Sequence, residues 1–206
     1  FNDWLAKASP GELGTLSPSN GLVFHAPFAG GFETAQGTIT TGEKSLTFTT
    51  AVATEPGYIA PVAYKAVPGV VLSDAQAGDF ERDQPFSASA WVKMPADGVG
   101  GSILARMDEA GGYRGWDLWM EGGRFGCHII HQWPGDALKV VAKQPLKGGV
   151  WYHVAVTYNG KSNAEGVSLY VNGKKQEVDV TANALKNTIK TTTPLKFAQR
   201  SNSARI

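Results

Sequence analysis

Residues 116–129 read WDLWMEGGRFGCHI, and this stretch determines the expected fold more directly than any other. The central Gly122-Gly123 pair suits the positive φ angles that a two-residue β-hairpin loop requires. Around that loop, one face carries apolar pairs: Trp116 with Ile129, Leu118 with Cys127 and Met120 with Phe125. The other face carries Asp117 with His128, Trp119 with Gly126 and Glu121 with Arg124. Because a slip of one residue would mix the two sets, the pattern predicts an antiparallel hairpin with one core face.

Short apolar segments continue on both sides of this hairpin, each bounded by Gly, Pro, Asn or Asp. Repeated short strands with turn signals are typical of an all-β sandwich or barrel. A second tight turn is predicted at Asn172-Gly173, although the apolar pairing after it is poorer. Residues 3–8 are the one helical candidate, with Asp3 suited to the N-cap position. We expect strands at residues 22–25, 46–49, 58–59, 70–72, 86–92, 102–106, 113–121, 124–133, 151–158 and 167–171.

The composition favours one globular domain and excludes several classes of partner. Of the 206 residues, 42% are hydrophobic and 18% are charged, and the formal net charge is +1. Without a basic stripe, nothing favours nucleic acid as a partner. No apolar run approaches the roughly 18 residues that a membrane-spanning helix needs, so membrane insertion is not expected. The single cysteine, Cys127, excludes an internal disulfide and is predicted to lie in the core.

Four segments occur in an order that is characteristic of one family. They are GLVFHAPF at 21–28, PFSASAWVK at 85–93, WYHVAVTY at 151–158 and LYVNG at 169–173. Together they resemble the laminin-G-like jelly-roll family of the concanavalin A-like lectin/glucanase superfamily. The resemblance covers roughly residues 20 to 200 and implies two packed antiparallel sheets, one of them concave. It also implies a module of a larger secreted or surface protein, often bacterial, that binds carbohydrates or proteins, sometimes with calcium.

The resemblance sets the expected domain organisation. Residues 1–20 are predicted to form a collar or linker, and residues 21–206 the sandwich. Family domains close with a strand resembling IDEVRIY, which this sequence lacks before Ile206. The opening strand, Leu22 to His25, should therefore lack a neighbour. Residues 1–20, a strand from a second chain, or sequence past Ile206 could cover this edge, and we expect the last, so that the parent protein continues past Ile206. The expected location is extracellular or at the cell surface, with the periplasm as an alternative.

Glycoside hydrolysis is not expected from the sequence. Related glucanases place acidic residues on one strand face as Glu-x-Asp-x-Glu, and the closest match here is residues 115–121. Gly115 occupies the place of the nucleophile. Asp117 and Glu121 would lie about 13 Å apart at roughly 3.3 Å per residue, whereas a glycosidase pair needs about 5–9.5 Å. The sequence therefore predicts a non-catalytic protein.

The candidate ligand site lies on the face of the hairpin opposite the core. Trp119 provides an aromatic ring for a sugar, with Asp117 and His128 as polar partners on the concave sheet. Gly126, opposite Trp119, would leave the ring uncovered. The alternative interpretation is that the ring covers the glycine for stability, with Asp117 and His128 as an ordinary cross-strand pair. Trp133, after the hairpin, is a second candidate ring.

The other notable residues receive less specific predictions. The resemblance implies that Trp91 and Trp151 pack in or near the core and that His153 is structural. Calcium remains open as a cofactor, because acidic residues occur in turn-like stretches but form no Asp-x-Asp-x-Asp array. Those acids are Asp79, Asp83, Asp108 and Asp136. Two functions stay open: a carbohydrate-binding module, and a protein-interaction or architectural domain without a sugar ligand.

Overall fold

The computed structural model describes residues 21–26, 38–41, 44–47, 53–59, 61–67 and 72–202. Its regular structure there is almost entirely β, apart from one 3-10 turn at Ala164–Gly166. The strands are β1 Thr38–Thr41, β2 Lys44–Thr47, β3 Thr54–Pro56, β4 Val62–Tyr64, β5 Ser73–Asp74, β6 Phe86–Lys93, β7 Gly101–Asp108, β8 Arg114–Glu121, β9 Arg124–Gln132, β10 Asp136–Pro145, β11 Trp151–Tyr158, β12 Val167–Val171, β13 Lys174–Lys175, β14 Val178–Asn183 and β15 Leu195–Phe197.

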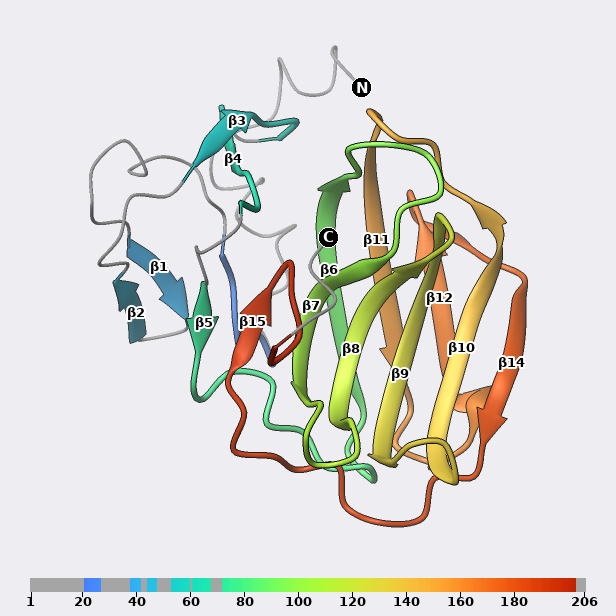
Figure 1. Cartoon of the computed structure of the whole chain (residues 1–206). Coiled ribbons are helices and arrows are strands. Elements are labelled where there is room, and N and C mark those ends of the chain that lie inside the picture. The colour runs from blue at the N-terminus through green and yellow to red at the C-terminus, as the bar shows by residue number, and fades with distance from the viewer. Residues whose placement is uncertain are drawn as a thin grey trace.

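Two antiparallel sheets pack against each other as a sandwich (Figure 1). The larger sheet has seven strands in the order β14-β10-β9-β8-β7-β15-β5, and the smaller has four in the order β13-β12-β11-β6. Two separate hairpins, β1-β2 and β3-β4, complete the described strands. The predicted all-β, two-sheet architecture of the jelly-roll kind is therefore confirmed.

The hairpin that fixed the predicted fold has the predicted register. β8 pairs with β9 so that Trp116 opposes Ile129, Leu118 opposes Cys127 and Met120 opposes Phe125. Gly122 and Gly123 have φ angles of 57° and 78°, as a tight hairpin loop requires. The second turn is also confirmed, and the poor pairing after it is reflected in β13, which has only two residues.

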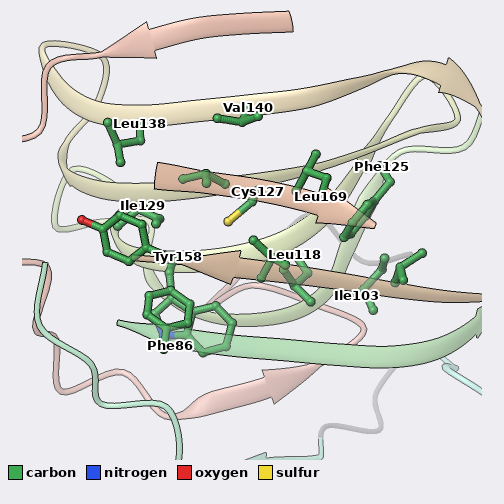
Figure 2. Packing of buried hydrophobic residues seen from close by; sticks show 14 of the residues in the cluster. Phe86, Ile103, Leu118, Phe125, Cys127, Ile129, Leu138, Val140, Tyr158 and Leu169 are labelled. Carbon is green, nitrogen blue, oxygen red and sulfur yellow. The ribbon is translucent and has the colours of Figure 1, made fainter. Parts of the chain in front are cut away.

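The core lies between the two sheets and follows from the alternation of each strand (Figure 2). Trp116, Leu118 and Phe125 all belong to it, as predicted, whereas Trp119 does not. Burying each such side chain stabilises the fold by about 1.5–3 kcal/mol. Cys127 lies in this core as well, where burial raises the pKa of its thiol well above the ordinary value.

Some predicted strands are absent and others were missed. Residues 22–25 form no strand, although the Phe24 ring packs 5.6 Å from that of Phe197. Residues 58–59 form a bend between β3 and β4 instead of a strand. β10 and β14 were not predicted, because lysines interrupt the apolar pattern of β10 and β14 is an edge strand with a mostly exposed pattern. The N-terminal collar with its short helix, residues 48–49 and residues 70–71 lie outside the described residues.

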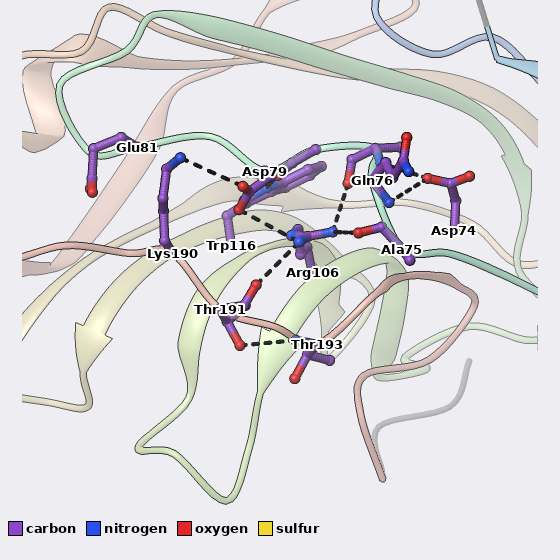
Figure 3. Close-up of polar contacts among 12 residues, drawn as sticks. Asp74, Ala75, Gln76, Asp79, Glu81, Arg106, Trp116, Lys190, Thr191 and Thr193 are labelled. Atoms are coloured by element: carbon purple, nitrogen blue, oxygen red, sulfur yellow. Dashed lines mark hydrogen bonds and ion pairs between the residues drawn. The ribbon is translucent and has the colours of Figure 1, made fainter. Parts of the chain in front are cut away.

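A buried arginine fastens the loops at one end of the sandwich (Figure 3). Arg106 of β7 donates from Nη1 to the carbonyl oxygens of Ala75 and Ala77, at 3.0 and 3.1 Å. Its Nη2 donates to the carbonyl oxygen of Thr191 at 3.1 Å and lies 3.5 Å from Asp79 Oδ1. This one side chain therefore ties the segment before β6 and the segment before β15 to the large sheet.

Candidate functional site

A pocket of about 200 Å³ lies on the outer face of the seven-stranded sheet. The sheet supplies part of its lining through β8, β9 and β10, and the loops and the segment after β15 supply the rest. The lining residues are Tyr113, Trp119, His128, Ile130, Trp133, Lys139 and Arg200. Three of the four predicted site residues, Trp119, His128 and Trp133, therefore meet at one place.

Trp119 forms one wall of the pocket. Its ring lies over Gly126, where an added Cβ would come within 2.9 Å of Trp119 Nε1. The indole Nε1 is enclosed and has no hydrogen-bond partner among the described residues. The ring is also packed against His128 at a centroid distance of 4.5 Å. The ring therefore covers the glycine, as the alternative interpretation predicted, and also contributes to the pocket lining.

Trp133 brings a second indole into the same pocket. It follows β9 directly, and its ring meets that of His128 edge-on at a centroid distance of 5.6 Å. Lys139 of β10 lies between the two tryptophans, with Nζ 5.0 Å from the Trp119 ring and 5.8 Å from the Trp133 ring. A cation at these distances is attracted by the electron-rich ring faces.

Asp117 lies beneath the pocket and does not line it. Its side chain is fully buried, so the predicted polar ligand partner is a supporting residue in the structure. Oδ1 accepts from the ring Nδ1 of His128 at 2.9 Å, and Oδ2 accepts from Arg200 Nε at 2.7 Å. Burial alone would raise the pKa of Asp117, but the neighbouring His128 and Arg200 hold it below its usual value.

The Asp117 carboxylate orients the imidazole of His128. An ionised carboxylate only accepts hydrogen bonds, so the Nδ1 that meets it carries the proton. The other ring nitrogen, Nε2, is then the one left for the pocket that His128 lines. Because Nδ1 donates to Asp117, it cannot also accept from Arg200 Nη2, which lies 3.5 Å away.

Arg200 completes the pocket from a distant part of the chain. It lies 83 positions from Asp117 in the sequence, in the segment that follows β15. That segment is fastened to the large sheet: the Ala198 N–H donates to the carbonyl oxygen of Ile103, and Ser201 Oγ donates to Glu109. No local sequence signal identifies Arg200, because its partner is fixed only when the segment folds back over the sheet.

Tyr113 forms the outer rim beside Arg200. Its ring lies 5.8 Å from the guanidinium carbon of Arg200, which is 5.1 Å from the Trp119 ring. The backbone of Tyr113 has a φ of 63°, a conformation that is costly for a bulky residue and that occurs preferentially at functional sites. The preceding Gly111-Gly112 pair was a sequence signal for an unusual loop here.

The family model for the concanavalin A-like lectin/glucanases superfamily matches residues 68–205, which include every lining residue of the pocket. The chain belongs to this superfamily. Among solved structures, the chain is similar to an endo-β-1,4-glucuronan lyase from the fungus Trichoderma reesei. The two share 11% sequence identity over 70% of this chain and 72% of that one, with a TM-score of 0.44. No curated protein matches the chain.

This superfamily member carries a second aromatic cluster on the outer face of its four-stranded sheet. Trp91, Trp151 and His153 form it with Tyr58 from the β3-β4 hairpin, beside a hollow of about 410 Å³.

Trp91 is 41% exposed, so the expectation that it packs in or near the core was wrong. The alternation of β6 explains this, because Phe86, Ala88, Ala90 and Val92 occupy the inner face and Trp91 must point outward.

The acidic residues considered for calcium do not gather. Within the described part of the chain, no group of three or more His, Cys, Asp or Glu side chains could hold a metal ion. Asp79 pairs with Arg106 and Lys190, and Asp136 accepts the backbone N–H of Lys186 at 2.6 Å. The described residues also contain no helix long and apolar enough to cross a membrane.

The residues of β8 that resembled a glucanase motif, Gly115, Asp117 and Glu121, make contacts within the fold. A Cβ at Gly115 would lie 1.9 Å from the carbonyl oxygen of Arg106, and the φ of Gly115 is 128°. Asp117 is enclosed, and Glu121 accepts from Lys139 Nζ at 2.9 Å. Gly115 therefore permits close strand pairing, Asp117 supports the base of the pocket, and Glu121 holds Lys139 in its wall.

Proposed function

We propose that this chain is a non-catalytic carbohydrate-binding module whose ligand enters the pocket beside Trp119. The observation that carries the proposal is the convergence of three aromatic side chains with polar groups in one recess. A pyranose has apolar C–H faces and a polar edge, so aromatic walls with a few fixed polar groups match it.

The size of the pocket limits how much of a glycan it takes. Its volume of about 200 Å³ is below the roughly 300–1,000 Å³ of sites for drug-sized ligands. One sugar ring of a chain would fill it, with neighbouring rings outside. Trp119 and Trp133 would flank this ring, and His128 Nε2 would meet a hydroxyl.

The proposal extends to the setting of the module. Membership of a superfamily that contains lectins supports a role in glycan recognition outside the cytoplasm. We infer a module of a secreted or surface protein. Fractionation of cells that express the parent protein tests this location, and recovery only from the cytoplasm would contradict it.

A glycan array, run with and without calcium, tests the binding function. The wild type should bind a defined set of glycans, and Trp133→Ala should weaken binding by about fivefold, since one aromatic contact contributes on the order of 1 kcal/mol. Trp91→Ala is the matched control, because it removes an exposed indole from the opposite sheet. Full affinity in Trp133→Ala together with loss in Trp91→Ala would contradict the placement.

A protein-interaction domain is the second candidate, and one observation favours it. Tyr58, Ile59 and Trp91 are exposed together around the β3-β4 hairpin, and exposed apolar patches often mark protein contacts. If the array shows no glycan ligand, co-purification of a partner that Trp91→Ala abolishes would favour this function.

A further inference from the structure

Among the residues that the structure describes, the lining of the pocket contains two cations and no carboxylate. Lys139 and Arg200 are the charged residues among the seven that line it. Their side chains are only 13% and 11% exposed, so both are held in the recess instead of extending into solvent. Charges in such a sheltered place act more strongly on a ligand than charges on an open surface.

The opposite charges lie behind or beside this lining. Asp117 is fully buried beneath it, and Glu121, which accepts from Lys139, is 38% exposed and is not among the described lining residues. The formal charges of these four residues sum to zero, so a preference for an anion depends on where the charges lie. An anion entering the recess would meet the two cations first and remain separated from Asp117 by the pocket wall.

Both cations keep donors for a ligand. Among the described residues, Arg200 uses Nε to bind Asp117, which leaves the N–H groups of its two Nη atoms, since Nδ1 of His128 cannot accept from them. Lys139 has three N–H donors and uses one for Glu121 among the described residues. The planar end of a guanidinium matches the two oxygens of a carboxylate or sulfate.

The position of Lys139 beside the two tryptophan rings indicates a role beyond pairing with Glu121. A surface lysine that pairs with a glutamate is ordinarily solvated, as Lys143 is: its side chain is 49% exposed and lies 3.6 Å from Glu177. Lys139, four residues earlier on the same strand, instead lies within cation–π distance of both Trp119 and Trp133. The structure therefore holds its ammonium group beside the rings where a sugar would stack.

We propose that the pocket selects a pyranose that carries an anionic group, with Lys139 and Arg200 binding the anion while the tryptophans stack on the ring. This inference rests on the proposed carbohydrate-binding function and names its ligand class. The anionic group is a uronate carboxylate or a sulfate ester, which present similar oxygens to the two cations.

Matched glycan pairs on one array test the inference. Each uronate polymer is paired with its carboxyl-reduced form, and each sulfated glycan with its desulfated form. Binding should be at least about tenfold tighter for the anionic member, because it forms charge-assisted hydrogen bonds that the neutral member lacks. The pair that shows the larger loss identifies the anion as carboxylate or sulfate. Raising the salt concentration should weaken binding of the anionic member.

Two lysine variants locate the effect. Lys139→Gln should lose about tenfold in affinity for the anionic glycan and little for its neutral counterpart. Lys143→Gln, on the same strand but outside the pocket, should bind as the wild type does. Thermal melting of both variants confirms that they fold.

The outcomes separate this inference from the function on which it rests. Equal binding of both members of every pair, or equal loss for both in Lys139→Gln, overturns the anionic selectivity and leaves the binding function intact. Absence of binding to any glycan overturns the carbohydrate-binding function, and the selectivity with it.

Discussion

Arg106 and Arg200 both pack against the seven-stranded sheet, but their hydrogen bonds differ in kind. Arg106 donates to three backbone carbonyl oxygens from two loops, which fixes main chain to main chain (Figure 3). Arg200 is held by one carboxylate and two aromatic rings, and its remaining donors lie at a pocket. In this protein the Nη atoms of Arg106 donate to backbone carbonyl oxygens and connect loops to the sheet, whereas Arg200 is held through Nε and presents its Nη atoms to the proposed site.

Replacing Arg106 should have the largest effect on stability. Arg106→Gln would remove the donor from the carbonyl oxygens of Ala75, Ala77 and Thr191, of which the bond to Ala77 is buried and the other two are partly buried. A buried unsatisfied group costs about 1–3 kcal/mol. We expect the free energy of unfolding to fall by about 3–5 kcal/mol. Urea denaturation measures this loss, while glycan affinity per folded molecule should stay unchanged. A loss below about 1 kcal/mol would contradict the clamp.

Replacing Arg200 should affect both stability and binding. Arg200→Gln leaves His128 as the one side-chain partner of Asp117 among the described residues. We expect the free energy of unfolding to fall by about 2–3 kcal/mol, which is at or below the usual cost of breaking a buried ion pair because His128 remains. Binding of the array ligand should also be lost. The double variant Asp117→Asn with Arg200→Gln should recover part of the stability but not the binding. If Arg200→Gln bound glycans normally, Arg200 would be a structural residue like Arg106, which would contradict its role in the pocket.

The same ion pair should make stability depend on pH. The pKa of Asp117 is lowered in the folded state, so its contribution is present above its unfolded pKa of about 3.9 and is lost as pH falls through the folded pKa. Asp117→Asn lacks this titration. Urea unfolding from pH 7 to pH 3 should therefore show the wild-type advantage shrinking below about pH 4. If the difference in stability between the wild type and Asp117→Asn stayed constant over this range, the pKa of Asp117 would be the same in the folded and unfolded states, which would contradict this prediction.

A smaller change tests whether the contact between the Trp119 ring and Gly126 matters. Gly126→Ala places a Cβ 2.9 Å from Trp119 Nε1, so the ring must shift, and overpacking typically costs about 1–3 kcal/mol. Glycan affinity should fall as well. Gly135→Ala is the control, because its Cβ would have no neighbour within 4 Å. Equal behaviour of the two variants would show that the contact between Gly126 and Trp119 is unimportant.

The sequence permitted accurate prediction where the determinants are local. The register around Gly122-Gly123 depends on two adjacent strands and a turn, and it brought Trp119, Gly126 and His128 to the correct face. Even the error at Trp91 was avoidable, since the apolar alternation of β6 already directs that ring outward.

The remaining features depend on long-range folding. Arg200 meets Asp117 across 83 positions, and only the folded segment after β15 brings them together. The burial of Asp117 could not be predicted either, because alternation assigns a face but does not show what covers it. Lys139 was missed along with the whole of β10.

The most direct test of the central claim follows the indole N–H signals of the six tryptophans by two-dimensional NMR during titration with the tightest array ligand. Single Trp→Phe variants assign the signals. The proposed site predicts that the signals of Trp119 and Trp133 shift in proportion to occupancy, while those of Trp91 and Trp151 stay in place. Shifts confined to Trp91 and Trp151 would move the binding site to the four-stranded sheet and contradict the account.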